Sequence, residues 1–177
     1  MDILAHTLWA GAGVVLLHRR KPIARRVAVA TVALAALPDV FQMIPVLLWG
    51  LLGAGSFEAI RAFAISVPGQ EPVLPSMVFV VSHTLHCSFH SALVASLVTL
   101  LVWRYKPLFL IPVLGWWSHI VIDVFTHSAD YYASPVLYPL TERGFDGIAW
   151  NTPWFMVVNY LALAVVGMVL LGLRRSK

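Results

Sequence analysis

PSMVFVVSHTLHCSFHSALVASLVTLLVW, residues 75–103, is an apolar stretch that contains three histidines. About 20 apolar residues are enough for a helix to cross the roughly 30 Å hydrocarbon layer of a membrane. The stretch exceeds that length and therefore predicts a membrane-spanning helix. His83, His86 and His90 are spaced i, i+3 and i+7 within it, so a helix would place them on one face. Ionisable side chains inside a membrane are costly and usually serve a function.

The composition of the whole chain also indicates an integral membrane protein. Its 177 residues are 60% hydrophobic and 11% charged, and the mean hydropathy is +0.84. Soluble domains are only about 45–50% apolar and about 25% charged. The length suits one helical bundle, so we expect a single transmembrane helical domain over residues 1–177. The one cysteine excludes an intramolecular disulfide and a cysteine-based zinc site.

The chain contains five segments that predict membrane spans: 3–17, 27–52, 75–103, 107–128 and 153–173. We expect Pro38 and Pro45 to kink or break the second span, because proline removes a backbone donor. Residues 53–74 contain "SFEAIRAFAI", which predicts a short interfacial helix. The predicted fold is thus an all-α integral membrane protein: a bundle of about five transmembrane helices, with a kinked or broken second span and a short interfacial helix.

The positive charges indicate an orientation in the membrane. Ten of the twelve Lys and Arg residues lie in the segments 18–26, 104–106 and 174–177. Basic loops favour the cytoplasm, so five spans would place the N-terminus outside and the C-terminus inside. The net charge of +4 lies in these short clusters between spans, so we expect the lipid bilayer as a partner and no nucleic acid.

Histidine and aspartate recur on single faces of four predicted spans. The residues are Asp2 and His6, then Asp39, then the three histidines of 75–103, and finally His119, Asp123 and His127. At about 1.5 Å per residue, the deepest of them lie between the midplane and the outer leaflet. Imidazole and carboxylate together suit Zn²⁺ or another divalent metal, as one or two ions. Coordination would also offset the cost of an acid near the bilayer centre, at least about 2.5–3.5 kcal/mol.

The candidate metal ligands are His6, Asp39, His86, His90, His119 and Asp123. We expect Asp39 to be either a ligand or the catalytic base that takes a proton from water. Three residues nearer the predicted water interface remain open candidates: Asp2, His83 and His127.

The order of short motifs resembles a known family. The motifs are "LAH" at 4–6, "LPD" at 37–39, "HS" at 90–91, "GWWSHIVID" at 115–123 and "SPVLYP" at 134–139. They resemble the bacterial inner-membrane metal-dependent hydrolases, described as LexA-binding, inner-membrane-associated hydrolases, over roughly residues 1–140. The resemblance implies a multi-pass protein of the bacterial inner (plasma) membrane with metal ligands at His6, Asp39, His90, His119 and Asp123.

Two departures from the family pattern concern the ligands. Phe41 stands where the family often has a second acid, and "HCSFHS" replaces the family's "HRG-x-THS". His86 is one turn before His90 and would replace the family's earlier histidine. A fainter resemblance to the zinc-dependent phospholipase C enzymes, through the His-x-x-x-Asp pair, suggests phosphoester chemistry.

The pattern is compatible with more than one class of function. The leading hypothesis is a membrane-embedded hydrolase in which zinc-activated water attacks an ester or phosphoester of a lipid-linked or amphipathic substrate. The alternative is a non-catalytic metal-binding or metal-transporting membrane protein. A transporter would spread ligands through both leaflets, whereas the cytoplasmic ends of the predicted spans carry only His18. A third interpretation is a metal-free polar network that orders the bundle. The sequence predicts no oligomeric state.

Overall fold

The computed structural model describes residues 1–65, 72–130 and 133–175, and these parts contain helices and no strand. The helices are α1 (Ile3–Arg20), α2 (Arg25–Leu52), α3 (Phe57–Ile65), α4 (Ser76–Phe89), α5 (Ala92–Tyr105), α6 (Leu110–Thr126) and α7 (Pro153–Arg175). A 3₁₀ turn, Pro107–Phe109, precedes α6. The all-α prediction is confirmed for the described residues.

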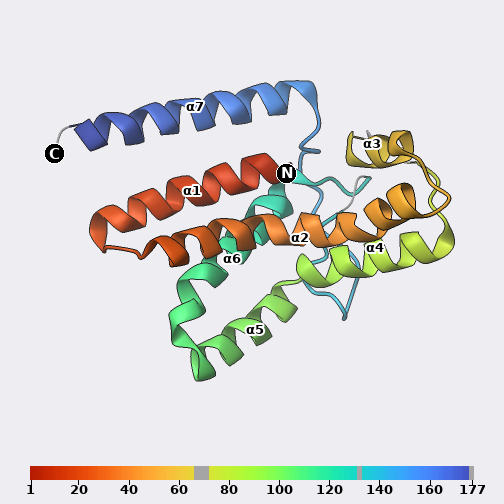
Figure 1. Ribbon diagram of the computed structural model, residues 1–177, viewed down its shortest axis with the longest axis horizontal. Coiled ribbons are helices and arrows are strands. Elements are labelled where there is room, and N and C mark those ends of the chain that lie inside the picture. The colour runs from red at the N-terminus through yellow and green to blue at the C-terminus, as the bar shows by residue number, and fades with distance from the viewer. Residues whose placement is uncertain (66–71, 131–132, 176–177) are drawn as a thin grey trace.

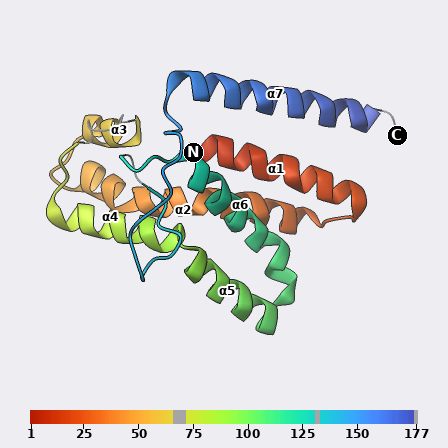
Figure 2. The same ribbon diagram turned by 180° about the vertical axis from the view of Figure 1, so that it is seen from behind.

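The central helix of the bundle is α2. It packs against α1, α4 and α6, while α7 lies along α1 and α3 packs on α2. The connection from α1 to α2 and the C-terminal end of α7 lie at one end of the molecule, and α3 lies at the other (Figures 1 and 2). The helices that carry the candidate ligands therefore meet around α2.

Three helical segments are long and apolar enough to cross a membrane: α2, Pro107–Thr126 and α7. The pair α4 and α5 adds a fourth if it counts as one bent span. The prediction of five spans is not confirmed, because α1 falls outside this set. Its 18 residues include His6 and end in the basic turn His18, Arg19 and Arg20, which lowers its apolar character.

Helix α2 continues across both of its prolines, from Arg25 to Leu52. The predicted kink or break of the second span is therefore not confirmed. Packing of neighbouring helices around a proline commonly allows a membrane helix to continue past it. Here Pro38 is buried, and α2 packs against α1, α4 and α6.

The predicted span 75–103 is interrupted at His90 and Ser91, where α4 and α5 meet at a bend of 59°. Ser91 Oγ accepts a hydrogen bond from the amide of Val94 and so caps α5. The same hydroxyl donates to the carbonyl of Tyr138, and the amide of Ala92 donates to the carbonyl of Val136. A loop distant in sequence thus provides hydrogen-bond acceptors for the amide of Ala92 and the hydroxyl of Ser91 at the break. His90 lies at the end of α4, and the helix does not continue through it into α5.

Helices α2 and α6 approach closely at Gly115. A Cβ atom added there would lie 1.9 Å from the carbonyl oxygen of Thr31. Small residues allow such contact between membrane helices. One turn further along α6, this approach brings His119 Nδ1 within 2.8 Å of the carbonyl oxygen of Ala35.

Polar side chains are buried in this fold and large apolar side chains are exposed. His90, His119 and Asp123 have no exposed surface, whereas Leu161 and Met168 on α7 are 62% and 64% exposed. A soluble protein shows the reverse distribution. The apolar exterior and the three or four apolar helices are what a membrane-spanning protein requires.

Candidate metal centre

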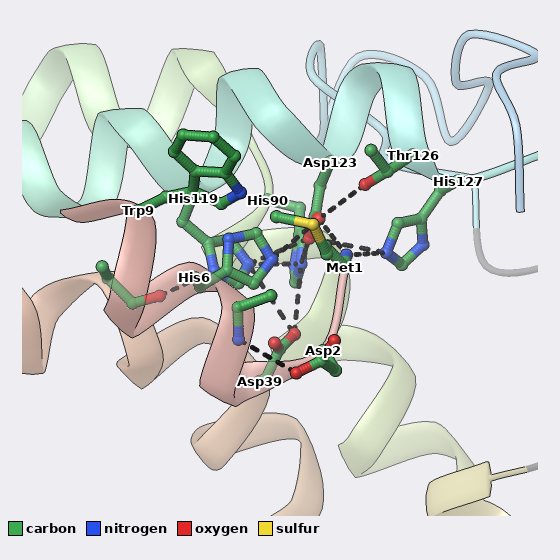
Figure 3. A network of polar contacts seen from close by, with 12 residues as sticks. Met1, Asp2, His6, Trp9, Asp39, His90, His119, Asp123, Thr126 and His127 are labelled. Carbon is green, nitrogen blue, oxygen red and sulfur yellow. Dashed lines mark hydrogen bonds and ion pairs between the residues drawn. The ribbon is translucent and has the colours of Figure 1, made fainter. Parts of the chain in front are cut away.

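Four of the predicted ligands converge beside α2. Asp39 comes from the middle of α2, His90 from the end of α4, and His119 and Asp123 from successive turns of α6. One ligand atom from each lies within 4.8 Å of the corresponding atom of all the others (Figure 3). We call these four residues the His/Asp group.

The separations within the His/Asp group match those of a coordination shell. His90 Nε2 and His119 Nε2 are 3.0 Å apart, and they lie 3.1 and 3.0 Å from Asp123 Oδ2. Asp39 Oδ1 lies 3.7 Å from both nitrogens. Ligands about 2.0–2.1 Å from a tetrahedral zinc ion are about 3.3 Å from one another. The four atoms are therefore close enough to one another to bind one ion.

Hydrogen bonds at Nδ1 fix the orientation and the tautomer of the two imidazole rings. His90 Nδ1 lies 2.8 Å from the carbonyl oxygen of His86, and His119 Nδ1 lies 2.8 Å from that of Ala35. A carbonyl only accepts, so each Nδ1 carries the proton and donates it. In the neutral rings, both Nε2 lone pairs then point into the His/Asp group, as in metal-ligating histidines.

This arrangement could bind a cation. Two Nε2 lone pairs and two carboxylates are held together in a buried place, and such acceptors repel one another unless positive charge lies between them. One shared proton would bridge a single pair of these atoms. A divalent ion would satisfy all four together, and the nitrogen and oxygen donor set suits Zn²⁺ or a similar metal.

Asp123 is the hub of the wider polar network. Its Oδ1 lies 2.9 Å from His6 Nε2, accepts from Thr126 Oγ1 and contacts the α-amino group of Met1. Its Oδ2 lies 3.5 Å from His127 Nε2. Both carboxylate oxygens are thus engaged, one within the His/Asp group and one on its far side (Figure 3).

The other two predicted ligands flank the His/Asp group. The ring of His6 stacks on that of His119 with centroids 3.8 Å apart. The ring of His86 lies 4.1 Å from that of His90, and His86 Nδ1 lies 3.1 Å from Gln42 Oε1. The structure therefore brings all six predicted residues into one region and places four of them around a single point.

The three open candidates differ in their positions. His127 joins the network through Asp123. Asp2 caps α1 by accepting from the amide of Ala5, and it also accepts from the hydroxyl of Tyr160. His83 is 38% exposed and lies 3.6 Å from Glu142, outside the His/Asp group.

Sequence reasoning missed the groups that position the ligands. The carbonyls of Ala35 and His86 orient the two imidazoles, but backbone atoms carry no residue-type signal. The loop before α7 also completes the end of α6, because the amides of Gly147, Ile148 and Trp150 donate to its last free carbonyls. Gln42 follows Asp39 by three residues on α2, so helical spacing is the one signal that pointed to it.

A cavity of about 350 Å³ adjoins the His/Asp group and lies against α3. We call it the α3 pocket; it is lined by Met1, Asp2, Ile3, Leu4, Asp39, Gln42, Met43, Phe63, Ala64, His127 and Trp150. Asp39 is the one member of the His/Asp group in this lining. Its side chain is 15% exposed, whereas His90, His119 and Asp123 are fully buried. An ion in the His/Asp group would therefore be reached from the α3 pocket, past Asp39.

Comparison with known proteins finds no matching protein family, curated protein or solved structure.

Proposed function

We propose that this protein is a membrane-embedded, zinc-dependent hydrolase of an ester or phosphoester bond in a lipid-linked or amphipathic substrate. One observation carries the proposal. Four ligand atoms converge on a single point, and Asp39 alone among their residues borders a cavity. A catalytic metal site differs from a structural one by keeping a position open for water or substrate.

The residues of the His/Asp group have two proposed roles: three bind the metal ion, and one takes part in the reaction. His90, His119 and Asp123 would hold the ion, since all three are buried and the two imidazole rings are fixed by hydrogen bonds. Zn²⁺ bound there would supply a Lewis acid that polarises an ester oxygen and lowers the pKa of water to about 7. Asp39 would accept a proton from water, because its Oδ2 has no hydrogen-bond partner among the described residues and it borders the α3 pocket.

We further propose that α1 is the fifth span, with the N-terminus outside and the C-terminus in the cytoplasm of a bacterial inner membrane. The basic segments 18–26 and 174–177 support this orientation, as does the family resemblance of the motifs. The connection from α1 to α2 and the end of α7 share one end of the molecule (Figure 1). In this orientation α3 and its pocket lie toward the outer leaflet.

Metal content measured by mass spectrometry on detergent-purified protein tests the site. We expect one zinc ion per chain, lost in His119→Ala and Asp123→Ala and retained in His83→Ala. His83 is a matched control because it lies outside the His/Asp group. A wild-type protein that holds no metal after zinc is resupplied, or alanine variants that keep it, would overturn the site.

Hydrolysis assays separate the enzyme from the alternative. We expect the zinc-loaded protein, and not the metal-free protein, to release p-nitrophenol from p-nitrophenyl decanoate or from dodecyl p-nitrophenyl phosphate. Stoichiometric zinc without hydrolysis of either compound would reject the enzyme and favour a metal-binding or metal-transporting protein.

A further inference from the structure

The α3 pocket has both polar and apolar side chains in its lining. The polar ones include Asp39 of the His/Asp group and His127, and the apolar ones include Leu4, Met43 and Phe63. Its residues come from the start of α1, the middle of α2, α3, the end of α6 and the loop before α7. A cavity with this mixed lining fits a molecule that joins a polar group to a hydrocarbon chain.

We propose that the α3 pocket binds one hydrocarbon chain of the substrate and selects an ester head group that carries at most one negative charge. The inference rests on the proposed function and deepens it, because it names the class of substrate: a carboxyl ester or phosphodiester, and not a phosphomonoester or pyrophosphate.

The size and position of the α3 pocket favour binding of a single hydrocarbon chain. Pockets for small ligands measure about 300–1,000 Å³, and this one, at about 350 Å³, lies at the lower limit. Leu4 is 57% exposed at its edge, and Ala64 of α3 is exposed there too. The pocket thus has exposed apolar residues in its lining, so a hydrocarbon chain can enter it from the lipid while any second chain stays in the bilayer.

Charge argues against a dianionic head group. Among the described residues, the pocket lining contains no lysine or arginine. Asp2 and Asp39 line the pocket and Asp123 belongs to the adjoining His/Asp group, so one divalent ion would meet three carboxylates before any substrate enters. A phosphomonoester or pyrophosphate would add at least about two uncompensated negative charges in a place of low dielectric, where phosphate sites normally supply arginine or lysine.

The nearest basic side chain on the adjoining helix is already engaged. Arg61 of α3 lies 2.7 Å from Glu58 Oε1, is 56% exposed and does not line the pocket. Recognition of an anionic group would therefore depend on a metal ion in the His/Asp group and not on a lysine or arginine of the described lining. A neutral or singly charged ester therefore leaves a smaller excess of negative charge than a dianionic one.

Binding of two uncleavable probes to the full-length, zinc-loaded protein in detergent tests the inference. Methyl dodecylphosphonate carries one negative charge and dodecylphosphonate carries up to two, while their chains are identical. The variant Ala64→Trp fills the mouth of the pocket. Ile65→Trp is its matched control, since Ile65 is the next residue of α3, is 59% exposed and does not line the pocket.

We expect methyl dodecylphosphonate to bind at least tenfold more tightly than dodecylphosphonate at pH 9. Ala64→Trp should weaken its binding at least tenfold, Ile65→Trp should leave it unchanged, and both variants should keep wild-type zinc content. Unchanged binding in Ala64→Trp, or tighter binding of the dianion, overturns the inference while the zinc site stands. Absence of zinc in the wild type overturns the proposed function instead. In that case, binding of the dodecyl probes to the metal-free protein still tests whether the α3 pocket takes a hydrocarbon chain.

Discussion

Replacing Gly115 with alanine should weaken metal binding by the His/Asp group, although Gly115 is not one of its residues. The added Cβ would lie 1.9 Å from the carbonyl oxygen of Thr31, whereas carbon and oxygen normally stay about 3.3 Å apart. Helix α6 must therefore move away from α2 by about 1.4 Å. Such overpacking costs about 1–3 kcal/mol, more than the roughly 0.5–1 kcal/mol that alanine gains over glycine in a helix.

The same movement reaches the ligands one turn further on. His119 would withdraw from Ala35 and from His90, although metal sites tolerate changes of only about 0.2 Å in their distances. We expect Gly115→Ala to lower zinc affinity at least about tenfold, which is the usual effect of disturbing the groups that orient a ligand.

Competition with a zinc chelator would measure the affinity, and thermal denaturation in detergent the stability. Gly167→Ala on α7 is the matched control, because nothing lies within 4 Å of its added Cβ. This control should keep wild-type affinity and gain up to about 1 kcal/mol of stability. Wild-type affinity and stability in Gly115→Ala would refute the close approach of α2 and α6.

Three further predictions concern the break, the outer helix and the proton dependence of the site. Ser91→Ala should lower the unfolding free energy by about 1–2 kcal/mol in thermal denaturation, because the α5 cap and the bond to Tyr138 are lost; Ser118→Ala should change little, since its hydroxyl bonds only within α6. Trp9→Phe should cost about 1 kcal/mol and expose α7 to limited proteolysis, because it removes the donor to Asn159 Oδ1; an unchanged cleavage pattern would count against this link between α1 and α7. Zinc retention, followed by mass spectrometry after dialysis, should fall as the pH drops below neutral, because imidazole binds metal only when unprotonated; retention that does not vary between pH 8 and pH 5 would exclude histidine ligands.

Helical spacing was the feature of the sequence that predicted most about the positions of the candidate ligands. His119 and Asp123, four residues apart, do lie on one face of α6, and Asp39 meets them from α2. These positions follow from the period of a helix, which the residue pattern records directly. The convergence of the helices was an expectation that required long-range packing, and Gly115 is the residue whose small size permits it.

The break between α4 and α5 was not predictable from local pattern. A single serine in an apolar run is a weak cap signal, and the acceptors that stabilise the break belong to Val136 and Tyr138, more than 40 residues later. For the same reason the effect of Pro38 was overestimated: whether a helix continues past a proline depends on the helices that pack around it.

The break at His90 also sets an order of assembly. Its backbone is completed by residues 136 and 138, and its imidazole meets its partners only when α6 is in place. While the chain is being inserted, Asp39 and His90 enter the membrane before any of these groups exist. A nascent chain that stops before residue 130 therefore lacks the residues that complete the break, so we expect a metal ion to bind only after synthesis has passed the loop that precedes α7. Metal content would then report the completion of folding as well as the presence of ligands.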